Sequence, residues 1–155
     1  MGRVSASIVV PGLASEAEAL WYDPRRWPGW IDDFAHTVEV SPEWPAQGRR
    51  LWDARPGGRG RVLERVTAFE PRTGQTLEVE DERLRGTQRV AFAPGSEEVT
   101  ITLSLDFRLK DSHALAWAVD RFFVRRALTA SLRRTLAAFA RERRGDMEVE
   151  DVVSR

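Results

Sequence analysis

The chain has no cysteine and only two histidines, His36 and His113. Without cysteine it can form no disulfide, present no thiolate nucleophile and hold no Cys-ligated zinc. The two histidines lie far apart and belong to no His-x-x-x-His pattern, so we expect no metal site and no cofactor. We interpret His113 as a surface or capping residue and His36 as a surface residue at a strand end. An acid/base role of His36 in a pocket is the alternative.

Charge of one sign and long apolar runs are also missing. The 24 acidic residues balance 24 basic ones, whereas nucleic-acid-binding proteins normally carry a basic face. No apolar run approaches the roughly 20 residues of a membrane span, and the N-terminus lacks the basic start and apolar run of a signal peptide. We therefore expect a cytoplasmic protein with no nucleic-acid partner and no transmembrane segment.

What the chain does have is 155 residues with 42% hydrophobic and 31% charged content. This composition is typical of one globular domain with a sizeable core. We expect the domain to span residues 1–145, with Gly145 capping the last helix. Residues 146–155 are expected to form an acidic, flexible tail.

Short runs of strand-forming residues alternate with turn residues along most of the chain. In the clearest run, residues 99–109, apolar and polar residues alternate without a miss, which is typical of an antiparallel strand with one buried face. Gly86 is expected to mark a turn between two strands. The predicted strands are residues 3–10, 36–40, 49–55, 61–70, 75–85, 87–93 and 99–109.

Two short helices are predicted after the first strand. Residues 14–22 have Ser15 as a candidate N-cap and acidic residues in the first turn, where carboxylates favour the helix dipole. Residues 25–34 form the second helix, which Pro28 and Gly29 break or bend.

The segment 23–30 leads out of the first helix with the sequence Asp-Pro-Arg-Arg-Trp-Pro-Gly-Trp. Two tryptophans and two prolines in so short a segment make a stiff aromatic corner. We interpret Trp27 as a packing residue at the junction with the sheet, because buried aromatic residues are mostly core residues. Trp30 follows the Pro-Gly break and is predicted to turn toward a cavity mouth.

A long helix is predicted for residues 113–144, which contain neither proline nor glycine. Its later half has one apolar face, and its earlier half has a second apolar stripe. Many strands joined by tight turns, followed by one long helix, indicate an α+β fold in which an antiparallel sheet of about seven strands covers that helix. One helix cannot fill the concave side of a curved sheet, so we expect a cavity beside its N-terminal half.

The inner face of the sheet is expected to line this cavity, since small-molecule sites are mostly apolar with a few polar groups. Trp52 belongs to the wall if its side of the strand faces inward, and Leu51 is the competing residue. The predicted ligand-binding residues are Trp30, Trp52, Leu77, Val79, Phe92, Ile101, Leu103, Leu105, Trp117, Arg121 and Val124.

Arg121 is the most specific candidate, because it shares a helix face with Trp117 and Leu128 and should point at the sheet. Burying a guanidinium alone is costly, so Arg121 needs a carboxylate partner or an anionic ligand. Glu64 or Asp81 is the candidate partner if its strand face turns inward. Arg121 is therefore either a ligand-orienting residue of the cavity or a member of an internal ion pair.

The element order and three local matches resemble the START/Bet v 1-like (SRPBCC) superfamily, and more narrowly its polyketide cyclase/dehydrase and lipid-transport group. The resemblance covers residues 4–144. It implies a helix-grip fold, and it implies binding of lipids, sterols, polyketides, quinones or hormones, with cyclisation or dehydration in a minority of members. The matches are residues 23–30, similar to Asp-x-x-x-Trp-Pro-x-Trp; the strand from Arg61 closed by Glu70-Pro71, with Leu77 opening the next strand; and Pro94-Gly95-Ser96 before the alternating strand.

The leading functional hypothesis is binding or transport of a hydrophobic small molecule, such as a lipid, polyketide or quinone-like compound, in the cavity. One alternative is a polyketide aromatase/cyclase-type enzyme using the same cavity. No positioned acid/base group stands out in the sequence, which disfavours an enzyme and leaves its catalytic residues unassigned.

A second alternative is a protein-interaction or dimerisation module, and the protein is expected to be a monomer or a homodimer. The second apolar stripe of the long helix would make the contacts, through Leu115, Val119, Phe122 and Phe123. The arginine pairs at 125–126 and 133–134 are interpreted as a solvated helix face. Transient contact with an anionic membrane surface is the alternative interpretation of these pairs.

Overall fold

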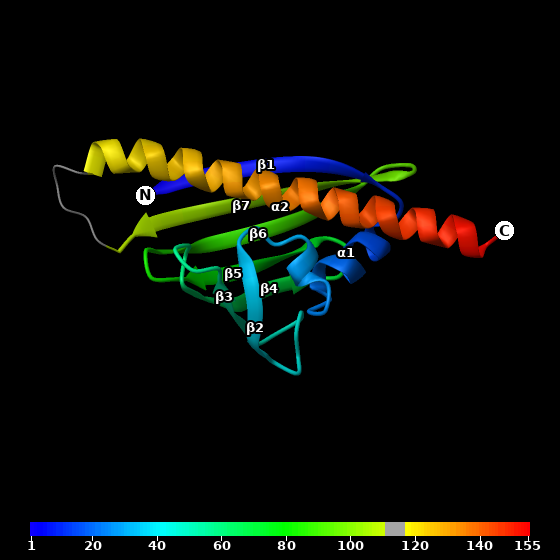
Figure 1. Cartoon of the computed structure of the whole chain (residues 1–155), viewed down its shortest axis with the longest axis horizontal. Coiled ribbons are helices and arrows are strands. Elements are labelled where there is room, and N and C mark those ends of the chain that lie inside the picture. Colours follow the sequence, from blue (N-terminus) through cyan, green and yellow to red (C-terminus); the bar gives the residue numbers. More distant parts are fainter. Residues whose placement is uncertain (111–116) are drawn as a thin grey trace.

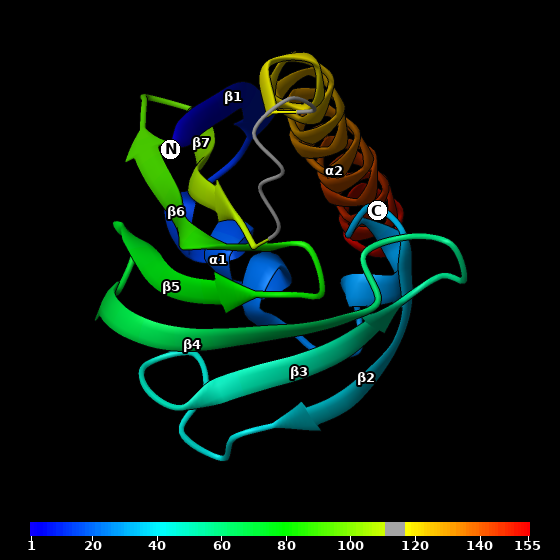
Figure 2. The ribbon, with the colours of Figure 1, turned by 90° about the vertical axis from the view of Figure 1, so that its left-hand side faces the viewer.

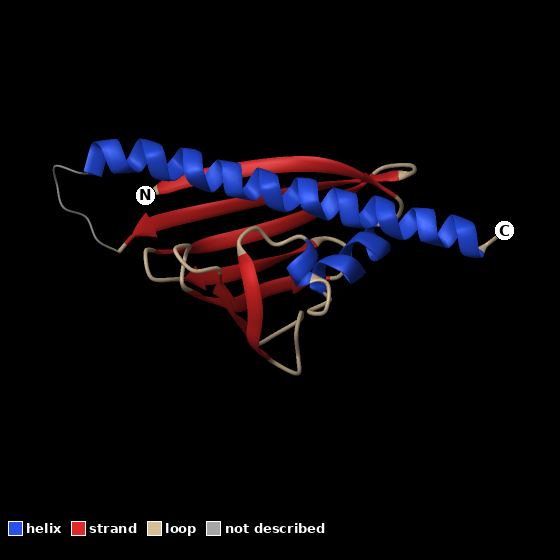
Figure 3. Ribbon diagram, in the orientation of Figure 1, coloured by secondary structure: helices blue, strands red, loops and turns tan. Residues whose placement is uncertain are grey.

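The computed structural model of the chain describes residues 1–110 and 117–155, and the side chains of residues 1–110 and 122–155. In these residues, seven strands form one antiparallel sheet, accompanied by two α-helices and a short 3-10 helix (Figure 3). The predicted α+β helix-grip class is confirmed. The elements are β1 (Gly2–Pro11), α1 (Ala14–Tyr22), η1 (Trp27–Gly29), β2 (Phe34–Val40), β3 (Arg49–Ala54), β4 (Arg61–Glu70), β5 (Gly74–Glu80), β6 (Leu84–Pro94), β7 (Glu98–Leu109) and α2 (Trp117–Val153).

The first two strands of the sequence lie at opposite edges of the sheet, whose order is β1-β7-β6-β5-β4-β3-β2. The chain between them therefore has to cross the open side of the curved sheet, and it carries α1 and η1 with it (Figure 2). This crossing closes one end of the space under the sheet. The aromatic corner is located in it, as the sequence predicts.

The long helix α2 runs across the concave side and packs chiefly along β1 (Figures 1 and 2). Its buried residues include Leu132, Leu136 and Phe139. On β7 the odd-numbered apolar residues from Val99 to Phe107 are buried, and the even-numbered residues point away from the helix. The alternation predicted for this strand is confirmed, and its inner face forms the centre of the core.

The turn between β5 and β6 lies at residues 81–83, and the predicted turn at Gly86 is wrong. The Asp81 carboxylate makes the turn, because its Oδ1 accepts from the backbone N–H groups of Arg83 (2.8 Å) and Leu84 (2.9 Å). Gly86 lies inside β6, where an added Cβ would be 2.1 Å from the backbone oxygen of Asp106 on β7. Glycine at this position allows two strands to approach closely rather than the chain to turn.

The helix α1 begins after Leu13, so Ser15 is not its N-cap. The Glu16 carboxylate accepts from the backbone N–H of Leu13 at 2.9 Å and from Arg143 Nη2 of α2 at 2.5 Å. The bond from Leu13 lowers the pKa of Glu16, and Arg143 adds to this against the opposing effect of burial. The second predicted helix is limited to the single 3-10 turn η1.

The helix α2 continues through Gly145 to Val153, so the prediction that Gly145 ends the helix is wrong. Glycine lowers helix stability by about 1 kcal/mol but does not by itself end a helix. Asp146, which follows Gly145, connects α2 to the aromatic corner, because its carboxylate accepts a hydrogen bond from Arg26 Nη2 at 2.9 Å. Among the described residues, neither α-helix contains the long apolar run that a membrane span requires.

Candidate functional site

Trp27 packs the aromatic corner against the sheet, in line with its interpretation from the sequence. The residue is fully buried, and its Nε1 donates to the backbone oxygen of Trp21 at 3.0 Å. Its ring centroid lies 5.6 Å from that of Trp44 in an edge-to-face arrangement. The Trp27 ring is packed and its single N–H is already hydrogen-bonded, so Trp27 offers no free donor to a ligand.

Trp30 is equally buried but is not satisfied. Its ring lies 4.3 Å from Trp21 and 5.3 Å from Phe139, measured between ring centroids. Its indole Nε1 is buried and has no hydrogen-bond partner among the described residues. An unpaired buried donor costs about 1–3 kcal/mol, so such groups need an explanation.

The strand β3 turns Trp52 inward, where it is 2% exposed, and leaves Leu51 half-buried. Because side chains alternate along a strand, Arg50 also faces inward. Arg50 lies directly opposite Glu64 of β4, and its Nε donates to Glu64 Oε2. Trp52 Nε1 donates to the same oxygen at 3.0 Å. A buried carboxylate is thus held by an arginine and an indole.

The guanidinium of Arg50 also lies near two aromatic rings. Its central carbon is 4.5 Å from the ring centroid of Trp27 and 5.0 Å from that of Trp44. Cation–π contacts of this kind offset part of the cost of burying the charge. The Nη1 atom of Arg50 is nevertheless buried without a partner among the described residues.

A second arginine, Arg59, enters the same region from the turn between β3 and β4. Its Nε donates to the buried Asp81 carboxylate at 2.7 Å, and its guanidinium lies 5.9 Å from the ring centroid of Trp52. Its Nη2 is buried and, among the described residues, has no partner.

These groups surround a small internal cavity of about 40 Å³, which we call the donor pocket. Helix α2 supplies residues 131, 132 and 135 to its wall. The unpartnered buried atoms of its lining residues, Trp30 Nε1, Arg50 Nη1 and Arg59 Nη2, are all N–H donors. Lining residues from the corner and the sheet include Trp30, Arg50, Trp52, Arg59, Glu64 and Leu103.

The charges at the donor pocket balance. Arg50 is paired with Glu64 and Arg59 with Asp81, so each guanidinium already has one carboxylate. The pocket therefore offers N–H groups that can donate hydrogen bonds, but it carries no net positive charge. The arrangement suits a neutral oxygen acceptor, such as a ketone or quinone oxygen, better than a carboxylate or phosphate.

Asp32 ties the end of the aromatic corner to α2. Its carboxylate accepts from Ser131 Oγ (2.8 Å) and from Arg134 Nε (3.0 Å), and its backbone N–H donates to Thr135 Oγ1 (3.1 Å). Burial raises the pKa of Asp32, but the hydrogen bonds from Arg134 and Ser131 outweigh this, and the net shift is downward. We call this set of contacts the Asp32 latch.

An open surface groove of about 320 Å³ lies on the other side of the latch. Trp30, Ile31 and Asp32 line both this groove and the donor pocket. The segment 30–32 is therefore the wall between the pocket and the surface, and the Asp32 latch holds that wall in place.

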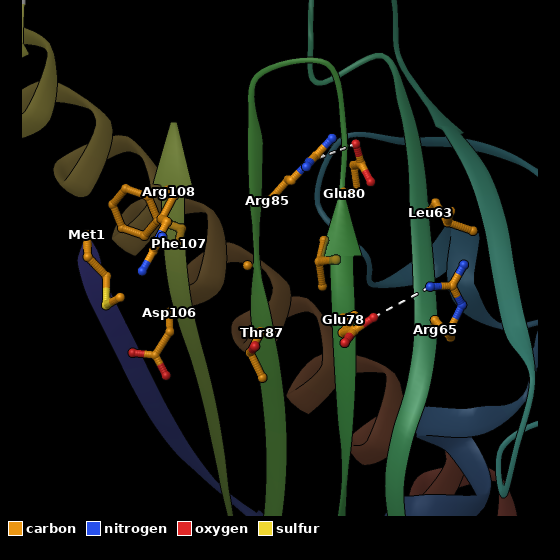
Figure 4. A pocket seen from close by; sticks show the side chains of 12 residues that line it. Met1, Leu63, Arg65, Glu78, Glu80, Arg85, Thr87, Asp106, Phe107 and Arg108 are labelled. Carbon is orange, nitrogen blue, oxygen red and sulfur yellow. Dashed lines mark hydrogen bonds and ion pairs between the residues drawn. The ribbon is translucent and has the colours of Figure 1, made fainter. Parts of the chain in front are cut away.

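The outer face of the sheet carries a separate hollow of about 450 Å³ (Figure 4). Four of its charged side chains are exposed and paired across strands, with 3.5 Å between Arg65 and Glu78 and 3.0 Å between Arg85 and Glu80. Exposed pairs of this kind contribute little binding specificity, because water already satisfies them. We therefore place the candidate site in the donor pocket.

The structure brings three of the predicted ligand-binding residues, Trp30, Trp52 and Leu103, together around the donor pocket. Val124 is partly buried against the core. The side chains of Trp117 and Arg121 lie outside those that the structure describes. The remaining predicted residues are buried in the core, namely Leu77, Val79, Phe92, Ile101 and Leu105.

Sequence reasoning missed Arg50 and Arg59. It did select Glu64 and Asp81 as inward carboxylates, but as partners of Arg121, whereas they pair with Arg50 and Arg59. A signal for Arg50 was available, because an inward Trp52 requires an inward residue two positions earlier. Arg59 lies in a turn, where no periodicity applies.

The described residues contain no cluster of three or more His, Asp or Glu side chains that could hold a metal ion. His36 lies exposed on β2, with its Nε2 3.1 Å from Asp53 Oδ2. Arg61 lowers the pKa of Asp53 most, with a smaller contribution from His36. His36 is exposed and does not line the donor pocket, so an acid/base role there has no support.

Comparison with known proteins identifies the family. The sequence profile of the family described as polyketide cyclase / dehydrase and lipid transport matches residues 1–143. The chain belongs to this family. No curated protein matches the chain by sequence.

Solved structures similar to this family member share its fold at low sequence identity. TTHA0849 from Thermus thermophilus has a TM-score of 0.79 at 18% identity, covering 94% of this chain and 99% of its own. A conserved protein from Geobacillus kaustophilus has a TM-score of 0.74 at 14% identity, with coverage of 93% and 96%. The di-domain ARO/CYC StfQ from the steffimycin biosynthetic pathway has a TM-score of 0.71 at 19% identity, covering 92% of this chain and 51% of its own.

Proposed function

We propose that the protein binds a hydrophobic small molecule whose neutral oxygen acceptor enters the donor pocket. The apolar body of the ligand extends from the donor pocket between the sheet and α2, beside Leu103 and Leu132, which line the pocket from these two elements. Apolar contact supplies most of the affinity, and the N–H donors orient the oxygen. The observation that carries the proposal is that three residues lining one cavity each have a buried N–H donor without a partner among the described residues.

The family supports this proposal in general terms, since its description includes lipid transport and polyketide cyclisation. The size of the donor pocket adds a constraint. Small-molecule sites usually measure about 300–1,000 Å³, so a cavity of about 40 Å³ accepts only a small part of a ligand. One carbonyl group matches that volume, which is why we assign the oxygen end to the donor pocket.

A matched series of naphthalenes tests the proposal by calorimetric titration. The three probes are 2-acetylnaphthalene with a neutral carbonyl, 2-naphthoate with an anionic carboxylate, and 2-ethylnaphthalene with no acceptor. We expect the ketone to bind at least about tenfold more tightly than the hydrocarbon, because two hydrogen bonds of about 1 kcal/mol each are gained. We also expect the ketone to bind more tightly than the naphthoate.

Trp30→Phe is the variant that probes the donor pocket, since it keeps an aromatic ring and removes one donor. The variant should bind 2-acetylnaphthalene about fivefold more weakly than the wild type does. Its affinity for 2-ethylnaphthalene should be unchanged. Tyr22→Phe is the matched control, because it also removes a buried polar group that has no partner among the described residues, and Tyr22 does not line the donor pocket. Equal affinity for ketone and hydrocarbon in the wild-type protein would refute the proposal.

A second candidate function is enolisation of a carbonyl substrate, as in a cyclase-type enzyme. The observation that favours it is that the Glu64 carboxylate and Arg59, whose Nη2 has no partner among the described residues, line the same pocket. A Glu64 oxygen would take a proton from the carbon between two carbonyls. The C–H electron pair would form the enolate, whose oxygen would accept from Arg59 Nη2.

Deuterium exchange into benzoylacetone, followed by NMR, tests this candidate. The wild-type protein should accelerate exchange at the carbon between the carbonyls, and Glu64→Gln should abolish the acceleration while benzoylacetone still binds. Exchange at the buffer rate in the presence of wild-type protein would show that the donor pocket binds its ligand without this chemistry.

A further inference from the structure

The outward side of α2 combines two phenylalanines with a line of arginines. At 100° per residue, Phe122, Phe123, Arg126, Arg133 and Arg144 fall within an arc of about 100° on the helix surface. All five are exposed. We call this set the α2 stripe.

The aromatic end of the α2 stripe is unusually exposed. Phe122 and Phe123 are 66% and 62% exposed, and their ring centroids lie 6.2 Å apart, edge to face. Adjacent exposed aromatic residues are not needed by the core. Clusters of this kind mark surfaces that contact a partner or a membrane.

The charge of this helix segment is strongly one-sided although the whole chain is neutral. Residues 122–144 contain seven arginines and one acidic residue, Glu142, and so carry a net charge of +6. The arginines that face the domain are paired, as shown by Arg134 with Asp32 and Arg143 with Glu16. The three arginines of the α2 stripe make no ion pair with any side chain that the structure describes.

The α2 stripe lies away from the candidate binding site. The side of the helix that faces the sheet carries Leu132 and Thr135, which line the donor pocket. Figures 1 and 2 show that no other element covers the outward side of α2 within the described residues. One side of α2 therefore contributes to the donor pocket, and the opposite side can bind a partner at the surface.

We propose that the α2 stripe binds the surface of an anionic lipid bilayer. A helix with apolar aromatic residues and arginines on one side can lie in the interface, with the rings among the acyl chains and the guanidinium groups at the phosphates. From Phe122 to Arg144 the stripe is about 33 Å long at 1.5 Å per residue. A flat bilayer can contact all of this length at once.

A bilayer fits this surface better than a second copy of the chain or a nucleic acid. Between Phe122 and Arg144 the α2 stripe contains no acidic residue, and the exposed Glu148 and Asp151 follow on the same side only beyond it. Two stripes aligned over the same residues would therefore bring arginines together. Nucleic-acid strands are held by aromatic rings that offer flat stacking faces, whereas Phe122 and Phe123 pack edge to face. A bilayer takes both the apolar rings and the positive charge.

Flotation with lipid vesicles tests the proposal on the full chain. The protein should float with phosphatidylcholine vesicles that contain phosphatidylglycerol, and high salt should weaken this binding. It should not float with pure phosphatidylcholine. Arg126→Gln and Arg133→Gln should each lower the partition coefficient about fivefold, and the double change Phe122→Ser/Phe123→Ser should abolish flotation.

The matched control is Arg83→Gln/Arg108→Gln, which removes two exposed charges from other parts of the surface and should float like the wild type. Circular dichroism and melting curves check that all variants fold. Three outcomes would overturn the proposal. They are equal flotation with neutral and anionic vesicles, tighter binding to a DNA or RNA oligonucleotide than to anionic vesicles, and a dimer in sedimentation that Phe122→Ser/Phe123→Ser dissociates.

Discussion

Arg50 illustrates how single residues set the character of the interior. Its charge is matched by Glu64, its guanidinium lies beside two tryptophan rings, and one of its N–H groups stays unpaired among the described residues. Burying both partners is costly, and well-packed apolar residues often stabilise a core as well or better. We therefore explain the pair by the N–H donor that Arg50 supplies to the donor pocket, and not by a gain in stability.

Breaking the Arg50–Glu64 pair from one side should be strongly destabilising. Glu64→Leu leaves the Arg50 charge buried without its carboxylate, and we expect the free energy of unfolding to fall by about 3–5 kcal/mol. The double variant Arg50→Met/Glu64→Leu should recover most of this loss. Urea unfolding measures both values.

The exposed pair Arg65–Glu78 is the control, because it joins β4 to β5 at the outer face. Changing Arg65 to Met and Glu78 to Leu should give a coupling energy below about 1 kcal/mol. A coupling energy for the buried pair no larger than this would contradict the assignment of Arg50 and Glu64 as a desolvated pair.

Asp32 gives a prediction about pH. Its pKa is lowered in the folded state, so its contribution to stability is fully present above its unfolded pKa, near 3.9. The contribution is lost as the pH falls from there through the lowered folded value. Asp32→Asn should therefore lower the melting temperature at pH 7 and change it much less at pH 2. Equal losses at both pH values would show that the carboxylate charge is not what holds the latch.

At the scale of elements, most strands and the aromatic corner could be predicted, because alternation and turn residues are local signals. The errors have local physical reasons. Gly86 suggested a turn but allows β6 and β7 to approach closely. Ser15 suggested a cap, but Glu16 reaches back to the backbone N–H of Leu13.

The end of α2 gives the prediction at this scale. Gly145 lies within the helix, and an added Cβ there would have no atom within 4 Å. Gly145→Ala should therefore stabilise the protein by up to about 1 kcal/mol, measured by urea unfolding. If Gly145 were instead a left-handed cap at the helix end, alanine would be strained and the variant would be less stable than the wild type.

At the scale of the whole molecule, the helix-grip architecture follows from the order of elements, but the donor pocket does not. Arg50, Glu64 and Trp52 come from neighbouring strands, while Trp30 comes from the crossing segment and Thr135 from α2. Which buried donors end unpaired depends on distances between these elements. A sequence pattern specifies which face a residue occupies, and it does not specify such distances.

Nitrogen NMR of the tryptophan indoles shows directly whether the donors of the donor pocket bind a neutral oxygen. Trp30→Phe assigns the Trp30 signal among the six tryptophans. On addition of 2-acetylnaphthalene, we expect a downfield shift of the Trp30 indole N–H. The Trp27 indole is already bonded to the backbone oxygen of Trp21 and should shift little. Addition of 2-ethylnaphthalene should leave the Trp30 hydrogen bonding unchanged. A Trp30 signal that responds equally to both compounds, or to neither at saturating ligand, would show that the Trp30 indole does not bind the ketone oxygen.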